Sequence, residues 1–148
     1  MWSHYANSHQ GFALAFDTDH EFFRNQTVPV VYSTARPHIR RGHWRDILRT
    51  KSVDWLYERE WRVIVNFVNL PAREKLVQPL PIRAIKAIFL GARTPPLTTK
   101  RIFDALQLSE YREVECYRME VHQAEFKVIA KPVSIEEPNS NLWMADGI

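Results

Sequence analysis

The stretch that decides the fold is Ala84-Ile-Lys-Ala-Ile-Phe-Leu90. Its nearly continuous apolar run predicts a central strand with both faces covered, because a strand with one solvated face would alternate apolar and polar residues. Gly91 and the proline pair at 95–96 end this strand. A helix is then predicted to start at Thr98 or Thr99 and to run to about Leu108, with an apolar stripe of Ile102, Phe103 and Leu106.

The segments around this strand predict further strands. Three predicted strands lie before it: Gly11–Asp17, Val28–Tyr32 and Glu60–Val68. Pro29 confines the second of these to a sheet edge, or else stands among its first residues. After the central strand, Val114–Val121 and Phe126–Val133 form a predicted hairpin. In Glu60–Val68 the pattern alternates, so that Trp61 and Val63 are expected on the core face, opposite Glu60 and Arg62.

Two short helices complete the prediction. One covers Asp19–Arg24, capped by Asp17 or Thr18. The other covers His43–Thr50, with one apolar stripe made by Trp44, Ile47 and Leu48. About six strands and about three helices in this irregular order predict an α+β fold with a mostly antiparallel sheet.

Length and composition limit the class of protein. The chain has 148 residues, of which 45% are hydrophobic and 25% charged, so we expect one domain over residues 1–135 and a polar, loose tail over 136–148. No apolar run approaches the roughly 20 residues of a membrane span, and nothing resembles a signal peptide. The single cysteine, Cys116, excludes an internal disulfide, and its acidic neighbours favour a packing role. We therefore expect a cytoplasmic protein with no membrane partner.

A basic segment lies between residues 36 and 51 and contains six basic residues and a single acidic residue, Asp46. Histidines and Trp44 are interleaved with these basic residues. Guanidinium groups fit phosphates and aromatic rings stack on bases, so the segment is a candidate site for nucleic acid or a phosphate ligand. The alternative is an ordinary solvated helix face and loop. The candidate anion-binding residues are Arg40, Arg41, Arg45 and Arg49.

Two aromatic and polar clusters are the other candidate sites. In the first, Trp2–Phe12, a hydroxyl and imidazoles at the head of a buried strand would line a pocket; the alternative has Trp2 and Tyr5 packed under the sheet. His4 and His9 are weak metal ligands, because five residues along a helix separate them by about 140°. The sequence indicates no metal site.

The second cluster is Trp55–Arg62. In an extended chain Glu58, Glu60 and Arg62 project from one face, where two carboxylates beside a guanidinium can stabilise a cation or act as a general base. The alternative is a structural salt-bridge ladder anchored by the aromatic residues.

These clusters resemble an uncharacterised bacterial family, domain of unknown function 2971, in order and spacing from residue 1 to about 110. The family's further segment before the first motif has no counterpart here, so the chain resembles the carboxy-terminal part of a longer family domain. The segments that carry the resemblance are Met1-Trp2-Ser3-His4-Tyr5-Ala6, His9-x-Gly11-Phe12, Phe16-Asp17, Trp55-x-Tyr57-Glu58-x-Glu60-Trp61-Arg62 and Ile88-Phe89-Leu90-Gly91.

A more distant resemblance concerns Glu58-x-Glu60, which is similar to the Glu-x-Glu motif of ADP-ribosyltransferase-fold enzymes. The resemblance implies that NAD is the substrate, that Glu60 supports the oxocarbenium-like ribose as nicotinamide leaves, and that Glu58 assists. It also implies that His4 or Tyr5 lines the nicotinamide pocket and that Arg62 contributes to substrate binding. In these enzymes a first-strand histidine or arginine that grips NAD lies upstream of the residues present here.

Three functional hypotheses therefore stay open from the sequence. The first is an ADP-ribosyltransferase-like domain or its inactive remnant. The second is a nucleic-acid or phosphate-ligand binding module that uses the basic segment. The third is a structural or interaction domain without catalysis, with a homo-oligomer formed through an unpaired sheet edge.

Overall fold

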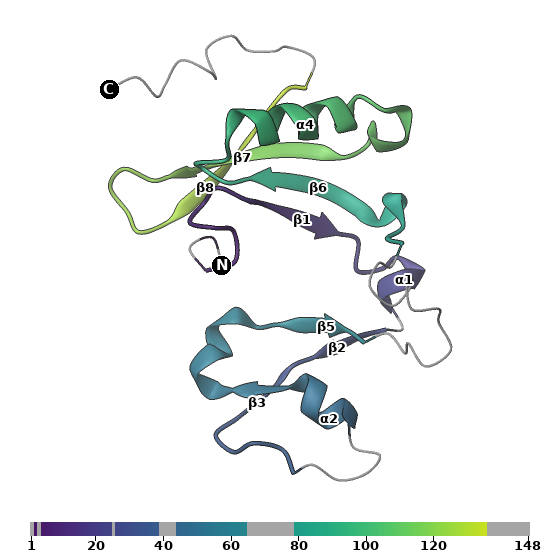
Figure 1. The fold of residues 1–148 in the computed structure, drawn as a ribbon, viewed down its shortest axis with the longest axis vertical. Coiled ribbons are helices and arrows are strands. Elements are labelled where there is room, and N and C mark those ends of the chain that lie inside the picture. The colour runs from purple at the N-terminus through teal and green to yellow at the C-terminus, as the bar shows by residue number, and fades with distance from the viewer. Residues whose placement is uncertain (1, 3, 25, 39–43, 65–78, 136–148) are drawn as a thin grey trace. The chain divides into compact units, whose positions relative to one another are not determined.

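The fold divides into two compact units (Figure 1). The computed structural model describes residues 2, 4–24, 26–38, 44–64 and 79–135. Unit 1 combines Met1–Asp17 with Pro81–Ile148, and unit 2 is Thr18–Leu80. The boundary at 80–81 coincides with a Leu-Pro pair that the sequence marks as a loop. The single domain over residues 1–135 stays a prediction, and the tail at 136–148 lies outside the described residues.

A four-stranded sheet forms the centre of unit 1. Its strands are β1 (Phe12–Phe16), β6 (Ile85–Leu90), β7 (Glu115–Val121) and β8 (Val128–Pro132), in the order β1-β6-β7-β8. The β1–β6 and β7–β8 pairs are antiparallel, and the β6–β7 pair is parallel. This confirms the α+β class, the mostly antiparallel sheet, the central position of β6 and the β7–β8 hairpin. The sheet has four strands rather than about six, because the remaining strands of the described residues pair within unit 2.

Helix α4 (Pro96–Leu106) carries the chain from β6 to its parallel neighbour β7. It begins two residues before the predicted start because Pro96 occupies the first turn, where a missing N–H costs nothing. Its apolar stripe packs on the core as predicted: Leu106 is 4% exposed and Leu90 of β6 is fully buried. Two short 3₁₀ helices, η2 (Ile82–Ala84) and η3 (Ser109–Tyr111), flank this region.

The residues before β1 form a series of turns that docks on the loop after β6. Asn7, Ser8 and His9 all have positive φ angles, of 47°, 54° and 69°. The carbonyl oxygen of His9 accepts a hydrogen bond from the Arg93 backbone N–H at 2.9 Å. A Cβ atom built on Gly91 would lie only 2.1 Å from that same oxygen, so this close approach requires glycine.

The elements that the structure describes in unit 2 are all short. In chain order they are α1 (Glu21–Arg24), β2 (Thr27–Pro29), β3 (Val31–Ser33), α2 (Trp44–Arg49), β4 (Thr50–Ser52), η1 (Val53–Glu58) and β5 (Trp61–Val63). β2 pairs with β5 in antiparallel fashion, and β3 pairs with β4 in parallel. The two predicted helices of this region are confirmed, but the predicted cap of the first, Asp17 or Thr18, is wrong: α1 begins at Glu21, and the residue that caps it is His20. In α1, the imidazole Nδ1 of His20 accepts a hydrogen bond from the Phe22 N–H at 3.2 Å at the start of the helix.

Two strand predictions in unit 2 need correction. The segment Val28–Tyr32 is two strands, divided at the buried residue Val30, whose N–H donates to the Glu60 carbonyl at 3.0 Å. Pro29 ends β2 and, among the described strands, β2 has only β5 as neighbour, so the edge position is right. In the segment Glu60–Val68 only Trp61–Val63 is a strand, and residues 65–68 lie outside the described residues.

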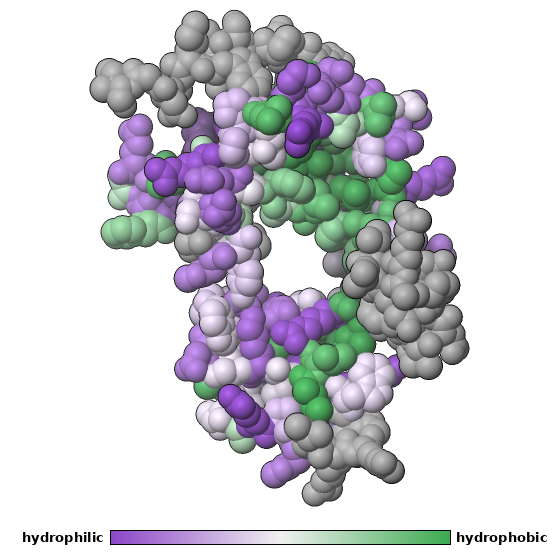
Figure 2. All heavy atoms as spheres, viewed as in Figure 1, coloured by the Kyte–Doolittle hydropathy of each residue, from purple (hydrophilic) through white to green (hydrophobic). Residues whose placement is uncertain are grey.

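Several residues expected on a core face are exposed. Trp61 is 63% exposed, because β5 pairs over only three residues with β2 and this small ribbon covers little side-chain surface. The stripe of α2 is also exposed: Trp44 at 42%, Ile47 at 37% and Leu48 at 47%. In unit 1, Tyr5 is 63% exposed, so the alternative in which Tyr5 packs under the sheet is wrong. Figure 2 accordingly shows apolar residues among polar ones on the visible surface of unit 2.

Candidate functional site

The two glutamates of the Trp55–Arg62 cluster are positioned by one unusual residue between them. Ser52 caps η1, and its hydroxyl oxygen accepts a hydrogen bond from the Asp54 N–H. The helix ends at Glu58, and Arg59 follows in the left-handed conformation with φ 48° and ψ 47°. A side chain with a Cβ atom rarely adopts this conformation, which costs on the order of 1 kcal/mol. The sequence predicts that Glu58 and Glu60 share a strand face; instead, Glu58 ends a helix and the turn at Arg59 brings the two carboxylates together.

Lys51 of β4 holds both carboxylates. Its ammonium group is 3.0 Å from Glu60 Oε2 and forms a second ion pair with Glu58. Arg62 of β5 binds the Glu60 carboxylate in a bidentate way, with Nε 2.6 Å from Oε1 and Nη2 3.1 Å from Oε2. We call Lys51, Glu58, Glu60 and Arg62 the charge cluster. Its side chains are 13–30% exposed, so water screens these ion pairs only in part.

Backbone hydrogen bonds tie the charge cluster to the neighbouring elements of unit 2. The Tyr32 hydroxyl of β3 accepts a hydrogen bond from the Glu60 N–H at 2.8 Å. Arg62 also donates, through Nη1, to the carbonyl oxygen of Leu48 in α2. The cluster therefore connects β3, β4, α2 and β5, although each of these elements is at most six residues long.

The charge cluster keeps the Glu60 carboxylate ionised. The hydrogen bond from Arg62, with a further contribution from Lys51, lowers the pKa of Glu60 to about 2. The hydrogen bond to Glu58 raises the pKa of Lys51, although burial of the ammonium group acts in the opposite direction. The hydrogen bond to Glu60 likewise raises the pKa of Arg62. Such a carboxylate is a poor general base at neutral pH, because its proton affinity is low. It suits electrostatic stabilisation of a developing positive charge instead.

A pair of aromatic side chains lies on one side of the lysine of the cluster. The Lys51 ammonium lies 5.0 Å from the centre of the Trp55 ring, and the Trp55 ring centre is 6.0 Å from that of Tyr57. Trp55 is 37% exposed and Tyr57 is 61% exposed. Exposed rings beside charged groups are a surface on which a planar heterocycle can stack.

The remaining predicted site residues belong to other elements. His4 and Tyr5 belong to the exposed turns of unit 1. Arg45 lies on α2 with its guanidinium 5.3 Å from the centre of the exposed Trp44 ring. Arg49 ends α2, and its Nε is buried without a hydrogen-bond partner in the part of the chain that the structure describes. Arg40 and Arg41 lie outside the described residues.

Sequence reasoning missed Lys51 and Tyr32 as members of the site. Lys51 stands seven and nine residues before the two glutamates. No single face of one helix or one strand contains Lys51 together with both of them. Tyr32 is 28 residues from Glu60. The parallel pairing of β3 with β4 brings Tyr32 and Lys51 together, and short parallel strands have no strong sequence signal.

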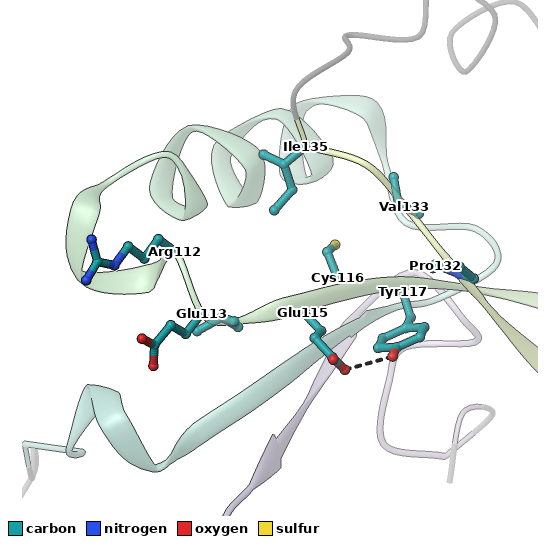
Figure 3. A pocket seen from close by; sticks show the side chains of 9 residues that line it. Arg112, Glu113, Glu115, Cys116, Tyr117, Pro132, Val133 and Ile135 are labelled. Atoms are coloured by element: carbon teal, nitrogen blue, oxygen red, sulfur yellow. Dashed lines mark hydrogen bonds between the residues drawn. The ribbon is translucent and has the colours of Figure 1, made fainter.

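A pocket in unit 1 has a volume of about 340 Å³ (Figure 3). Its wall includes Cys116, Glu115, Tyr117 and Ile135. Burial raises the pKa of the Cys116 thiol, so the thiol stays protonated at neutral pH, as expected for the predicted packing role. The hydrogen bond to Glu115 raises the pKa of Tyr117. None of the predicted site residues that the structure describes lines this pocket.

The fold and the charge cluster define an α+β protein whose unit 2 holds a neutral, half-buried cluster of charged side chains. A family model described as protein of unknown function (DUF2971) matches residues 1–36. This supports the resemblance over those residues; the resemblance of the later segments stays a prediction. No curated protein and no solved structure matched the chain. Within the described ranges, no helix has the length and apolar character needed to cross a bilayer.

Proposed function

We propose that the chain is an ADP-ribosyltransferase-like domain that uses NAD, with Glu60 as the catalytic carboxylate and Glu58 as its helper. The observation that carries this proposal is the convergence of both carboxylates on Lys51, with Glu60 held ionised. The left-handed Arg59 between them adds support, since backbone strain often accompanies function. The exposed rings of Trp55 and Tyr57 offer a stacking surface for a base or for nicotinamide.

The proposed chemistry is cleavage of the bond between nicotinamide and the ribose. The bonding electrons leave with nicotinamide, and positive charge develops on the ribose, where an ionised carboxylate stabilises it. A nucleophilic oxygen or nitrogen of the acceptor, or water, then forms a bond to the same ribose carbon and loses its proton, with Glu58 assisting the acceptor. In the free protein Lys51 and Arg62 neutralise Glu60. The diphosphate of a dinucleotide is an alternative partner for these two cations, because it carries two negative charges. Binding of the diphosphate would free the Glu60 carboxylate from Lys51 and Arg62, so that it can interact with the ribose. In this arrangement Arg62 contacts the diphosphate and has the substrate-binding role.

Calorimetric titration with NAD and an assay of nicotinamide release test this proposal together. We expect Glu60→Gln to lower the rate of nicotinamide release about 100-fold or more, with binding of NAD changed by only a few-fold. Glu21→Gln, on α1 of the same unit, is the matched control and should leave both quantities unchanged. His4→Ala and Tyr5→Ala should weaken NAD binding if these residues contact the nicotinamide.

The opposite outcome is equally clear. Absence of NAD binding and of nicotinamide release in the wild-type chain would assign the charge cluster to the structural alternative. The stability of Glu60→Gln does not separate the two hypotheses, because the ion pairs of Glu60 with Lys51 and Arg62 stabilise the fold in both. The neutral sum of its two cations and two carboxylates is what that alternative predicts. The fold would then belong to an interaction domain without catalysis.

A second candidate function is nucleic-acid or phosphate binding through residues 36–51. The observation that favours it is the exposed Trp44 ring with the Arg45 guanidinium over it, a pairing suited to a base and its phosphate. Binding to single-stranded nucleic acid should weaken with salt, and Arg45→Ala should reduce the slope of log K against log salt by about one. Arg101→Ala, in unit 1, is the control. A salt-independent interaction would contradict this candidate. Both functions are compatible if nucleic acid is the acceptor.

A further inference from the structure

The sheet of unit 1 has two edges, β1 and β8, and no described strand pairs with the outer side of either (Figure 1). Along β1, every second residue forms its backbone hydrogen bonds with the neighbouring strand β6. Gly91 N–H donates to the Gly11 carbonyl, and Asp17 N–H donates to the Ala84 carbonyl. Odd-numbered residues of this strand therefore face β6, and the backbone groups of Phe12 and Leu14 point to the outer side.

The β8 edge is protected against pairing with another strand. His122 N–H donates to the Lys127 carbonyl and Val133 N–H donates to the Cys116 carbonyl, so Ala130 and Pro132 are the residues whose backbone faces outward. Pro132 has no N–H to offer there. The neighbouring Lys131 is charged, with a side chain that is 57% exposed. Proline and lysine are the residues by which natural proteins block an edge strand.

The β1 edge has neither device. Its sequence is Phe-Ala-Leu-Ala-Phe, with no charge and no proline, and Phe12 is 48% exposed. The pairing of β1 with β6 has one irregularity. Ala15 pairs with Ala87 and Phe16 pairs with Ile85, so the extra residue lies on β6. β1 itself therefore stays regular along its length. An apolar, regular and unblocked edge strand is a template for strand addition.

The sequence of β1 also reads the same in both directions. In an antiparallel pair of two copies centred on Leu14, each leucine faces the other leucine, and Ala13 of one copy faces Ala15 of the other. Phenylalanine stands opposite phenylalanine at the ends, and such aromatic cross-strand pairs are favourable. Asp17 of one copy faces Gly11 of the other, so like charges do not oppose each other. The side chains thus complement themselves about a two-fold axis.

We propose that two copies of this chain associate through β1, by antiparallel pairing about Leu14 that joins their two sheets into one. The Leu14 backbone supplies the central bonds: its N–H and C=O both point outward, so the two copies exchange a pair of hydrogen bonds at the axis. This surface belongs to unit 1 and does not depend on the function proposed for the charge cluster.

Sedimentation equilibrium of the full chain over a range of concentrations tests this association, with Leu14→Pro as the main variant. Proline at residue 14 removes an N–H that faces outward and leaves the hydrogen bonds to β6 in place. We expect a dimer for the wild type and a dissociation constant at least about tenfold higher for Leu14→Pro. Ala130→Pro makes the same change at the outer side of β8, so it should leave the dissociation constant unchanged.

Phe12→Lys is the second variant, for the case that Leu14→Pro fails to fold. It places a charge on the exposed end of the edge and should also favour the monomer. Circular dichroism shows which variants are folded. A wild-type chain that stays monomeric up to about 1 mM would overturn the proposal. So would a folded Phe12→Lys or Leu14→Pro that dimerises as the wild type does, or an Ala130→Pro that separates the copies.

Discussion

Arg59 shows how a single backbone conformation can create a site. Its left-handed φ of 48° turns the chain between η1 and β5 and directs both flanking carboxylates to Lys51. Glycine adopts this conformation without strain, but arginine does not. The strain is therefore a local cost that the charge cluster offsets.

Substitution of Arg59 measures that strain. We expect Arg59→Gly to change the free energy of unfolding by between about 0 and +1 kcal/mol, because relief of strain exceeds the entropy lost by glycine. Arg59→Val should lower it by about 1–2 kcal/mol, since a β-branched side chain fits this region poorly. Urea unfolding of both variants gives the values. A more stable Arg59→Val would contradict the assignment of strain.

The pKa of Glu60 predicts how stability depends on pH. The folded pKa is about 2, below the ordinary value of 4.5, so the ionised carboxylate stabilises the fold fully above pH 4.5. This stabilisation is lost as the pH falls from 4.5 towards 2. At pH 7, Glu60→Gln should lower the free energy of unfolding by about 1–3 kcal/mol. The difference between the two proteins should shrink in acid; a constant difference from pH 7 to pH 2.5 would count against the ion pairs.

At the residue scale, the sequence predicts the carboxylates of the site but not the partners that bind them. The sequence pattern alone identifies these residues as candidates, because Glu58, Glu60 and Arg62 follow one another at intervals of two residues. Lys51 and Tyr32 join them only through the pairing of β3 with β4 and the turn at Arg59. These are tertiary features that no short sequence pattern determines.

At the scale of elements, the two longer predicted helices behave differently. The α4 stripe is buried on the sheet, and Leu106 is 4% exposed. Leu48 of α2 is 47% exposed, although the amphipathic pattern of α2 is equally clear. A helical pattern therefore predicts the helix itself, but whether its stripe is buried depends on a sheet large enough to cover it.

Paired truncations test this difference. Leu106→Ala should lower the free energy of unfolding by about 2–4 kcal/mol, because it leaves a cavity beside Leu90 and Val114. Leu48→Ala should cost much less, about 1 kcal/mol or under, since about half of that residue is already exposed to water. Chemical unfolding of both variants compares them. Equal losses would show that Leu48 is buried in solution.

Gly91 joins two elements that are far apart in the sequence. Its backbone packs against the His9 carbonyl, so Gly91→Ala forces a Cβ atom into a space where one would lie 2.1 Å from oxygen. We expect a loss of at least about 2 kcal/mol in unfolding free energy. The amides of residues 4–11 should also exchange faster with solvent. Gly11→Ala, where the nearest atoms are at 3.2 Å, should cost less and serves as comparison.

The sequence predicts strong elements better than weak ones. β1, β6, α4 and the β7–β8 hairpin combine a long apolar pattern with flanking glycine or proline, and each lies where predicted. The division of residues 28–32 into two strands was not predicted. The change of partner at Val30 depends on a hydrogen bond to Glu60, 30 residues along the chain.

At the scale of the whole molecule, buried side chains are distributed unevenly between the two units. Among the described residues, the buried apolar side chains of unit 2 are Phe23 and Val30, whereas unit 1 has eight, including Leu90, Leu106 and Cys116. Burial of apolar surface is the main favourable contribution to folding. Unit 1 is therefore expected to be the more stable unit.

Hydrogen exchange should show this difference directly. The slowest amides are expected in β6 and β7, the two inner strands of the sheet, and the amides of β2 and β5 should exchange at least about tenfold faster. Mass spectrometry of deuterated peptides separates these segments. Equal protection of both units would contradict this expectation and would indicate one cooperative unit.

The connection between β1 and β6 has a consequence for folding order. These strands are antiparallel neighbours, yet unit 2, residues 18–80, lies between them in sequence, so unit 2 takes the place of a hairpin loop. The ends of an insertion at such a place are held close together by the host sheet. During synthesis, β1 must wait until all of unit 2 has emerged before it can pair with β6, and a folded unit 2 would shorten the effective loop that this pairing must close.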